Sequence, residues 1–239
     1  MLDEKRMNRV LEKLDTDQML ITDPFAIYYL TGRWIFAGER FLGLLIKKGK
    51  KPILYLNELF RFDEDLGVTK KMITDTDSVA ELLKYDVDPN KALGVDKTLE
   101  ARFLLPMIDG AIASKFINGS LAVDHTRAIK DEEEIALMRE SSHINDLAMA
   151  EFKKLPKSGI TEIEVANQML DIYKKLGAEA YSFSPIVAFG VNAADPHHMP
   201  DETVLHEGET VLFDVGCKYH GYCSDMTRTF FFKGTPTEE

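Results

Sequence analysis

The chain has 239 residues, a formal net charge of −11 and 45% hydrophobic residues. This length exceeds that of a usual single domain, so we expect two domains or one large domain, with enough chain for a substantial core. The acidic balance, without clusters of Lys and Arg, argues against a nucleic-acid partner, because binding to a phosphate backbone depends on clustered basic side chains.

The sequence also argues against secretion and against membrane insertion. No run of eighteen consecutive apolar residues occurs, and the first residues, MLDEKRMNRV, are charged and unlike a signal peptide. Two cysteines, Cys217 and Cys223, are too few for a disulfide scaffold and suit a reducing compartment. We therefore expect a soluble, cytoplasmic protein with no membrane partner.

Residues 1–128 alternate between helical and strand patterns. A helix is predicted over residues 3–14 and a short strand over 19–21, and GERFLGLLIKKGKKPILYL predicts two strands around a turn. The runs KKMITD and ALGVD have the pattern of buried strands, and helical runs follow them at 78–85 and 99–107. This alternation predicts an α/β domain.

A change in composition after VDHTRAIKDEEE places a domain boundary near residue 128 and a second domain over 129–239. The next 25 residues are charged and have helical periodicity, and Asp131 with Glu134 has the spacing of a capping box. A second helix is predicted to begin at Thr161, paired with Glu164 in the same kind of box, and to end at Gly177. One stripe of the first helix carries Leu137, Ser141, Ile144, Ala148 and Phe152.

The segment VLFDVGCKYHGYCSDMTRTFFF, residues 211–232, places two aspartates in otherwise apolar strand-like runs. If two antiparallel strands reverse at Tyr219 and His220, Asp214 directly faces Asp225. Opposed side chains lie on one face of a sheet with Cβ atoms about 4.5 to 5.5 Å apart, where like charges repel. The other face is apolar, so the pair needs a cation or a shared proton to be stable.

Three interpretations of this pair remain open from the residues alone. In the first, Asp214 is a turn or edge residue and Asp225 is a partner of Arg228. In the second, the two carboxyl groups share a proton. In the third, they bridge two metal ions that activate a water and polarise a carbonyl. Oxygen ligands favour Mn²⁺, Mg²⁺ and similar ions over a thiolate-bound zinc.

The same register gives expectations for the residues around the pair. It puts Cys223 on the aspartate face, opposite Gly216, and Cys217 on the other face, so no disulfide is expected between them. Cys223 is interpreted as a small buried hydrophobic residue. Thr227 shares the aspartate face, where it is either a hydrogen-bond donor to a ligating carboxylate or a plain strand residue.

The segment NAADPHHMPDETVLHEGETVLFDVGCKYHGYCSDMTRTFF, with ITDPFAIYYLTG near the front, closely resembles the pita-bread metallopeptidases in their Xaa-Pro dipeptidase (prolidase) and aminopeptidase P branch. The resemblance implies a creatinase-type α/β N-terminal domain over residues 1–128 and the first part of a pita-bread α+β domain over 129–239.

The resemblance also implies the site. Asp214 and Asp225 match the first two metal ligands, and His197 matches the catalytic histidine that positions substrate and stabilises the tetrahedral intermediate. Two divalent ions are implied, with manganese expected and cobalt or zinc as alternatives. His198 has no firm counterpart and is interpreted as loop surface or pocket wall.

The implied activity is hydrolysis of the peptide bond next to proline in a dipeptide or short peptide by a homodimer. The family's other ligands, one His and two Glu, come after the second Asp, and the chain stops at Glu239. The final GTPTEE has the pattern of a helix start. We therefore expect a C-terminally truncated chain that is inactive as it stands.

Other functions stay open. Aminopeptidase P activity on longer peptides and a non-catalytic pita-bread interaction module are the main alternatives. The Asp pair argues against a creatine amidinohydrolase, and the N-terminal domain argues against a methionine aminopeptidase.

Overall fold

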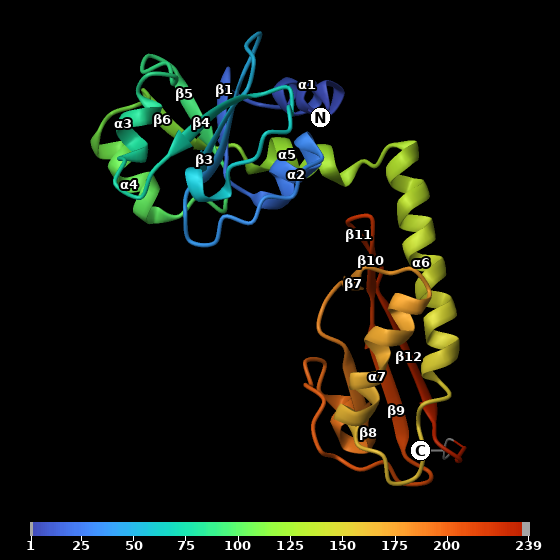
Figure 1. Ribbon diagram of the computed structural model, residues 1–239. Coiled ribbons are helices and arrows are strands. Elements are labelled where there is room, and N and C mark those ends of the chain that lie inside the picture. Colours follow the sequence, from blue (N-terminus) through green and yellow to red (C-terminus); the bar gives the residue numbers. More distant parts are fainter. Residues whose placement is uncertain (1, 236–239) are drawn as a thin grey trace. The chain divides into compact units, whose positions relative to one another are not determined.

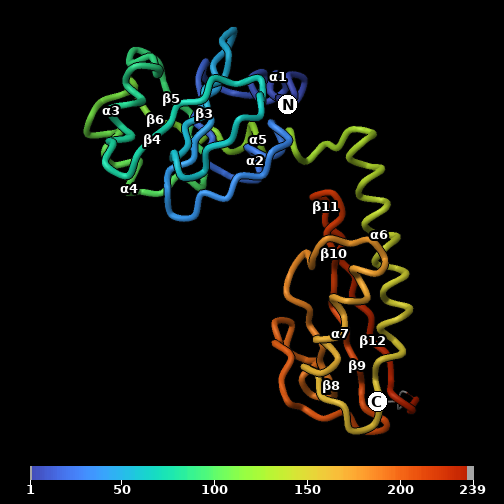
Figure 2. The backbone as a smooth tube through the Cα atoms, viewed as in Figure 1, coloured from blue at the N-terminus to red at the C-terminus, as the bar shows by residue number. Residues whose placement is uncertain are grey.

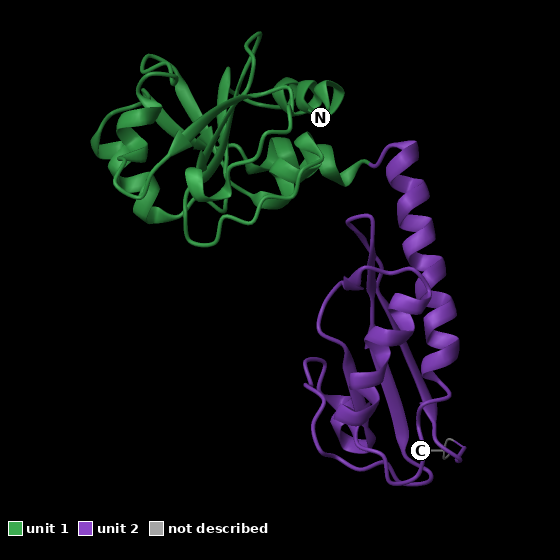
Figure 3. Cartoon of the chain, in the orientation of Figure 1, with its two compact units in different colours: residues 1–129 green, residues 130–239 purple. Residues whose placement is uncertain are grey.

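The computed structural model describes residues 2–235 and divides the chain into two compact units, residues 1–129 and 130–239 (Figure 3). In this described part of the chain, no helix is both long enough and apolar enough to cross a membrane. The helix start predicted for GTPTEE runs beyond Thr235 and lies outside the described residues.

A six-stranded sheet forms the centre of unit 1 within these residues, in the order β4-β3-β2-β1-β5-β6 (Figure 1). Only β2 of these strands is antiparallel to its neighbours, so the other strands all run in one direction. The strands are β1 (Gln18–Ile21), β2 (Leu42–Lys47), β3 (Ile53–Asn57), β4 (Thr69–Ile73), β5 (Ala92–Val95) and β6 (Lys115–Asn118).

Apolar cores lie on both faces of this sheet. In β2, Leu44 and Ile46 belong to one core and Leu45 belongs to the other. Burial on both faces explains the nearly continuous apolar runs that predicted these strands. The helices are α1 (Glu4–Glu12), α2 (Pro24–Thr31), α3 (Val79–Leu83), α4 (Ala101–Asp109) and α5 (Ser120–Ala128), with a 3-10 turn η1 (Glu58–Phe60).

The sequence patterns did not predict α2, β6 or α5. A start signal for α2 is nevertheless present, because Asp23 caps the helix by accepting from the Phe25 amide at 2.9 Å and Pro24 occupies its first turn. These missed elements complete the α/β layering of unit 1.

Two helices open unit 2, and both predicted capping boxes are confirmed. α6 (Glu132–Phe152) begins with the reciprocal Asp131–Glu134 pair, and α7 (Glu162–Lys175) begins with the Thr161–Glu164 pair. In α6 the predicted stripe is buried from Ser141 onward. These helices pack against β9 (Thr210–Val215), whose Val211, Phe213 and Val215 lie in their core.

The described strands of unit 2 form two small sheets, in the orders β12-β9-β8 and β11-β10-β7. In the first sheet, the face of β9 away from the helices carries Leu212 and Asp214, both only half-buried. The remaining elements are β7 (Ala180–Tyr181), β8 (Ile186–Phe189), the 3-10 turn η2 (Gly190–Ala194), β10 (Cys217–Tyr219), β11 (Tyr222–Cys223) and β12 (Met226–Phe231).

The predicted register of the final hairpin is wrong by one residue at the turn. The chain reverses at His220 and Gly221, which both have positive φ, 46° and 81°. That combination defines a two-residue turn whose twist matches the flanking strands. Consequently Tyr219 pairs with Tyr222, and Asp214 faces Thr227 instead of Asp225.

The register also corrects the expectation for the cysteines. Cys223 pairs with Lys218 instead of Gly216 and is exposed, so its interpretation as a small buried residue is wrong. Cys217 is buried, and both cysteines are free thiols.

Candidate metal centre

Asp214 lies in the central strand of a three-stranded sheet. Its register partners are Ile186 on β8 and Thr227 on β12. The Thr227 hydroxyl donates to Asp214 Oδ1 at 2.9 Å, which shows that these two side chains share a face. Thr227 therefore restrains the orientation of the Asp214 carboxylate and leaves it lone pairs for another partner.

Asp225 lies in the short break between β11 and β12 and is exposed. Its pKa is raised above the ordinary value, first by desolvation and next by the negative charge of the Asp214 carboxyl group. The two carboxyl groups are therefore neighbours although they are not directly opposed. A hydrogen bond with the Asp214 side chain is the third cause of the raised pKa, so the two groups interact along a diagonal of the hairpin.

Neither carboxylate has an ion pair with a basic side chain in the described part of the chain. Arg228, the partner considered for Asp225, instead donates to the Thr227 carbonyl at 2.8 Å. Asp225 is thus an acidic group beside a second acidic group, with no basic side chain to compensate it. Such a pair of oxygen donors suits a divalent cation.

Gly216 allows the close approach that places Asp225 beside Asp214. A Cβ atom at residue 216 would lie 2.0 Å from the Ser224 carbonyl oxygen and 2.2 Å from Ser182 Oγ. Ser182 Oγ donates to that Ser224 carbonyl at 2.8 Å, and the Ser182 amide donates to the Gly216 carbonyl at 3.0 Å. The absence of a side chain at Gly216 therefore lets the residue after β7, Ser182, and the residue after β11, Ser224, meet beside it.

Buried hydrogen bonds hold β9 against the helices next to this point. The Asn145 amide of α6 donates to the Val215 carbonyl at 3.2 Å and accepts from the Tyr173 hydroxyl of α7 at 2.6 Å. Asn145 and Tyr173 are fully buried, and a buried amide is stable only when its polar atoms have partners. This network joins both helices to the strand that carries Asp214.

His197 lies in the long loop between β8 and β9, where it is exposed. Its amide donates to Asp195 Oδ1 at 2.9 Å, which fixes a local turn. Figure 2 shows the loop as an irregular segment beside β8 and α7. The structure thus places His197 in unit 2 with Asp214 and Asp225.

The sequence interpretation missed a second polar cluster around Glu162, the first residue of α7. Glu162 is fully buried, and its Oε2 lies 2.6 Å from His198 Nε2. His198 is therefore a partner of a buried carboxylate, and not only loop surface. The capping box locates the start of α7, but nothing in the sequence shows that Glu162 points inward toward His198.

Glu162, His198 and Asp201 each offer a ligand atom, and these atoms lie within 4.8 Å of one another. The Glu162 carboxylate, however, accepts three hydrogen bonds and also contacts His198 Nε2, so its oxygens are already occupied within the protein. The Asp214–Asp225 pair is the better candidate metal centre because its oxygens are less occupied.

Comparison with protein-family models finds two matches that cover nearly the whole chain. Residues 5–129 match the Creatinase/Prolidase N-terminal domain, and residues 136–239 match Metallopeptidase family M24. The two matches meet where the chain divides into its two compact units.

Relatives and solved structures agree with these matches. An uncharacterized peptidase of Staphylococcus epidermidis is 33% identical over 236 residues, which cover 98% of this chain and 67% of the relative. An uncharacterized peptidase of Staphylococcus aureus is 32% identical over 238 residues, which cover 98% of this chain and 68% of the relative. A prolidase from Pyrococcus horikoshii has a TM-score of 0.84 at 26% identity (98% of this chain, 67% of that one). A Xaa-Pro dipeptidase from Bacillus anthracis has 0.82 at 29% (98% and 66%). The chain thus spans about two thirds of the length of these proteins.

Gly216→Ala should strongly destabilise unit 2. The added methyl group would overlap the Ser224 carbonyl, whose residue is held by a hydrogen bond from its amide to the Cys217 carbonyl, so we expect a loss near the upper end of about 1 to 3 kcal/mol in the free energy of unfolding. Urea denaturation measures this loss. Gly94→Ala is the control, because its Cβ would lie 3.3 Å from the flexible Leu14 side chain. Equal effects of the two changes would contradict this role of Gly216.

Asp214→Asn should lower the pKa of Asp225 and stabilise the metal-free protein. The pKa of this carboxyl group is higher in the folded state than in the unfolded state. The free energy of unfolding therefore falls as the pH rises from the unfolded-state pKa through the folded-state pKa. Removing the Asp214 charge reduces that fall. We expect a gain below about 1 kcal/mol at neutral pH, because the pair is partly exposed and screened. Urea denaturation at several pH values with a chelator tests this, and a mutant no more stable than the parent at neutral pH would contradict it.

Proposed function

This chain belongs to metallopeptidase family M24, and on that premise we propose that it is a metal-dependent exopeptidase that hydrolyses the bond next to proline, as a Xaa-Pro dipeptidase does. Its fold is a creatinase-type α/β N-terminal domain followed by part of a pita-bread domain. Prolidases and a Xaa-Pro dipeptidase among the similar structures support the choice of substrate.

The proposed metal ligands are Asp214 and Asp225. Their fit to a divalent cation is supported by the raised pKa of Asp225 beside Asp214, which marks two acidic groups without a compensating positive charge. Oxygen donors of this kind suit Mn²⁺, with Co²⁺ or Zn²⁺ as alternatives. When bound there, two divalent ions would supply an activated water and a polarised carbonyl.

The chain's own residues have distinct proposed roles. Thr227 holds Asp214 through the 2.9 Å hydrogen bond, which keeps that carboxylate in one orientation. His197 is the proposed catalytic residue, and it donates a hydrogen bond to the substrate oxygen on which charge develops. A dedicated enzyme is required for this substrate because the peptide nitrogen of proline has no N–H to be recognised.

The assembly and location that we propose follow the same premise. The whole protein is a homodimer that acts in the cytoplasm on proline-containing dipeptides or short peptides. The single observation that carries the function is the acidic pair on the open face of the sheet, in a chain of this family.

Proline release from a dipeptide such as Ala-Pro tests the function. In a form of the protein that also carries the family's remaining ligands, we expect Mn²⁺-dependent release, abolished by a chelator and reduced at least about a hundredfold by Asp225→Asn, because loss of a ligand removes the bound ions and with them the activated water. Colorimetric detection of free proline measures the rate, and Asp171→Asn on α7 is the control substitution.

Three other outcomes would change the proposal. Cleavage of longer peptides with proline second, but not of dipeptides, would identify an aminopeptidase P. Binding of a protein partner without any hydrolysis would support an interaction module. Cleavage that persists unchanged in the Asp225→Asn variant would show that this pair is not the centre.

Metal binding can be tested without activity. Added Mn²⁺ should raise the melting temperature of unit 2, because a ligand that binds only the folded state stabilises it in proportion to the logarithm of its concentration. Differential scanning fluorimetry across a Mn²⁺ titration measures the shift. The shift should disappear in Asp214→Asn and in Asp225→Asn, and an undiminished shift in both would contradict the assignment.

A further inference from the structure

Glu162 is a carboxylate with no solvent exposure. Burial of an ionised carboxylate is very unfavourable unless hydrogen bonds replace its hydration. Its place at the first position of α7 contributes to this replacement, because the amino end of a helix stabilises negative charge. The other groups that replace the hydration of this carboxylate come from a single segment of the chain.

Three donors and the His198 ring reach this carboxylate, and all lie between residues 189 and 201. Oε1 accepts from the Phe189 amide at 2.7 Å and from Asn192 Nδ2 at 3.0 Å. Oε2 lies 2.6 Å from His198 Nε2 and accepts from the Asp201 amide at 3.2 Å. The donors come from the start, the middle and the end of one loop, so the loop folds around one negative charge.

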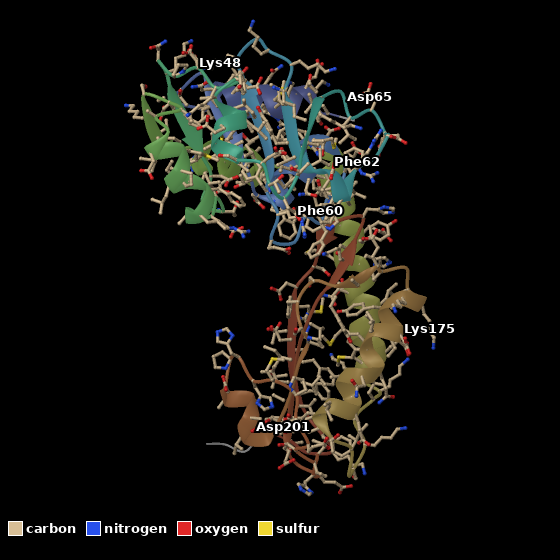
Figure 4. All side chains as sticks on the ribbon, turned by 60° about the vertical axis from the view of Figure 1, so that its left-hand side comes forward. Lys48, Phe60, Phe62, Asp65, Lys175 and Asp201 are labelled. Carbon is tan, nitrogen blue, oxygen red and sulfur yellow. The ribbon has the colours of Figure 1, made fainter. Side chains whose placement is uncertain are left out.

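The backbone at the start of α7 binds the same loop. The amides of Glu162 and Ile163 donate to the carbonyls of Thr203 and Asp201, at 3.2 and 3.1 Å. Asp201, labelled in Figure 4 near the 3-10 turn η2, therefore has both its amide and its carbonyl bound to the beginning of α7. These backbone hydrogen bonds add to those of the Glu162 side chain in holding the loop against α7.

His197 lies inside this anchored segment, immediately before His198. The His198 ring contacts Glu162, and the His198 amide donates to the Asp195 carbonyl at 3.2 Å. His197 is therefore held on both sides, by the Asp195 turn and by its neighbour's contact with Glu162, while its own ring is exposed.

We propose that Glu162 is a positioning residue, which acts through His198 and the backbone of residues 189–203 to hold His197 where it meets the substrate. This inference rests on the proposed function for the role of His197. The anchoring of the loop by Glu162 does not depend on that function and can be measured separately.

The first experiment measures amide hydrogen exchange in Glu162→Gln. A glutamine has one acceptor oxygen, and its NH₂ group opposes the backbone N–H donor on the other side, so at least one backbone hydrogen bond to the loop is lost. We expect the amides of Phe189 and Asp201 to exchange about ten- to a hundredfold faster, with α6 and β12 unchanged, because local opening is less costly. Glu164→Gln, which changes the capping box of the same helix turn, should leave the loop amides unchanged.

The second experiment tests whether the contact between Glu162 and His198 fixes the position of the His197 ring. The ring signals of His197 in the NMR spectrum should broaden or split in Glu162→Gln and in His198→Leu. His198→Gln retains a side-chain donor and should restore a single narrow signal. In a form of the protein that hydrolyses Ala-Pro with Mn²⁺, the first two variants should lower kcat by about tenfold or more with a smaller change in KM, since loss of positioning acts mainly on the transition state.

Each outcome separates this inference from the proposed function. Absence of hydrolysis by a form that carries the family's remaining ligands removes the function, while faster loop exchange would still support the anchor. Loop exchange and His197 signals that stay at parental values in Glu162→Gln would overturn the inference, as would exchange that rises equally throughout unit 2. A Mn²⁺ thermal shift abolished by Glu162→Gln would show that Glu162 is a metal ligand and not a positioning residue.

Discussion

The absence of a side chain at Gly216 is the constraint on which the candidate site depends. The Ser224 carbonyl and the Ser182 hydroxyl occupy the space where a Cβ would lie, at 2.0 and 2.2 Å. Their approach separates the final hairpin into two small sheets, and Asp225 sits at that junction. Asp214 lies two residues before Gly216, so one backbone position brings the two acidic groups together.

The surroundings of Glu162 and Asp225, two acidic residues of unit 2, differ in how far the side chain's acidic group is satisfied by other groups, and this difference indicates function. Glu162 is fully buried, accepts three hydrogen bonds and contacts the His198 ring, so its oxygens are satisfied by the loop and serve the structure of that loop. Asp225 has a raised pKa because it is partly desolvated and because it lies beside the Asp214 carboxyl group. An uncompensated acidic pair lowers stability unless something binds it, which is why the metal centre is proposed there.

Local signals in the sequence predicted many elements of the fold. The two capping boxes were confirmed because each forms between residues three apart, at the start of α6 and of α7. The hairpin register was wrong because its turn, at His220 and Gly221, was centred one residue too early. Such an error moves every cross-strand partner, so Asp214 gained Thr227 as its opposite residue and Cys223 gained Lys218.

The sequence by itself determined that the chain is α/β in its first part, that two capped helices open the second part, and that two aspartates occur close together near a hairpin. These features depend on neighbours in the chain, whose spacing is visible in the sequence. Only the tertiary structure decided that Glu162 points inward to His198, which lies 36 residues further on. It also decided that Gly216 admits Ser182 and Ser224, because contacts between distant segments arise from packing and leave no periodic pattern.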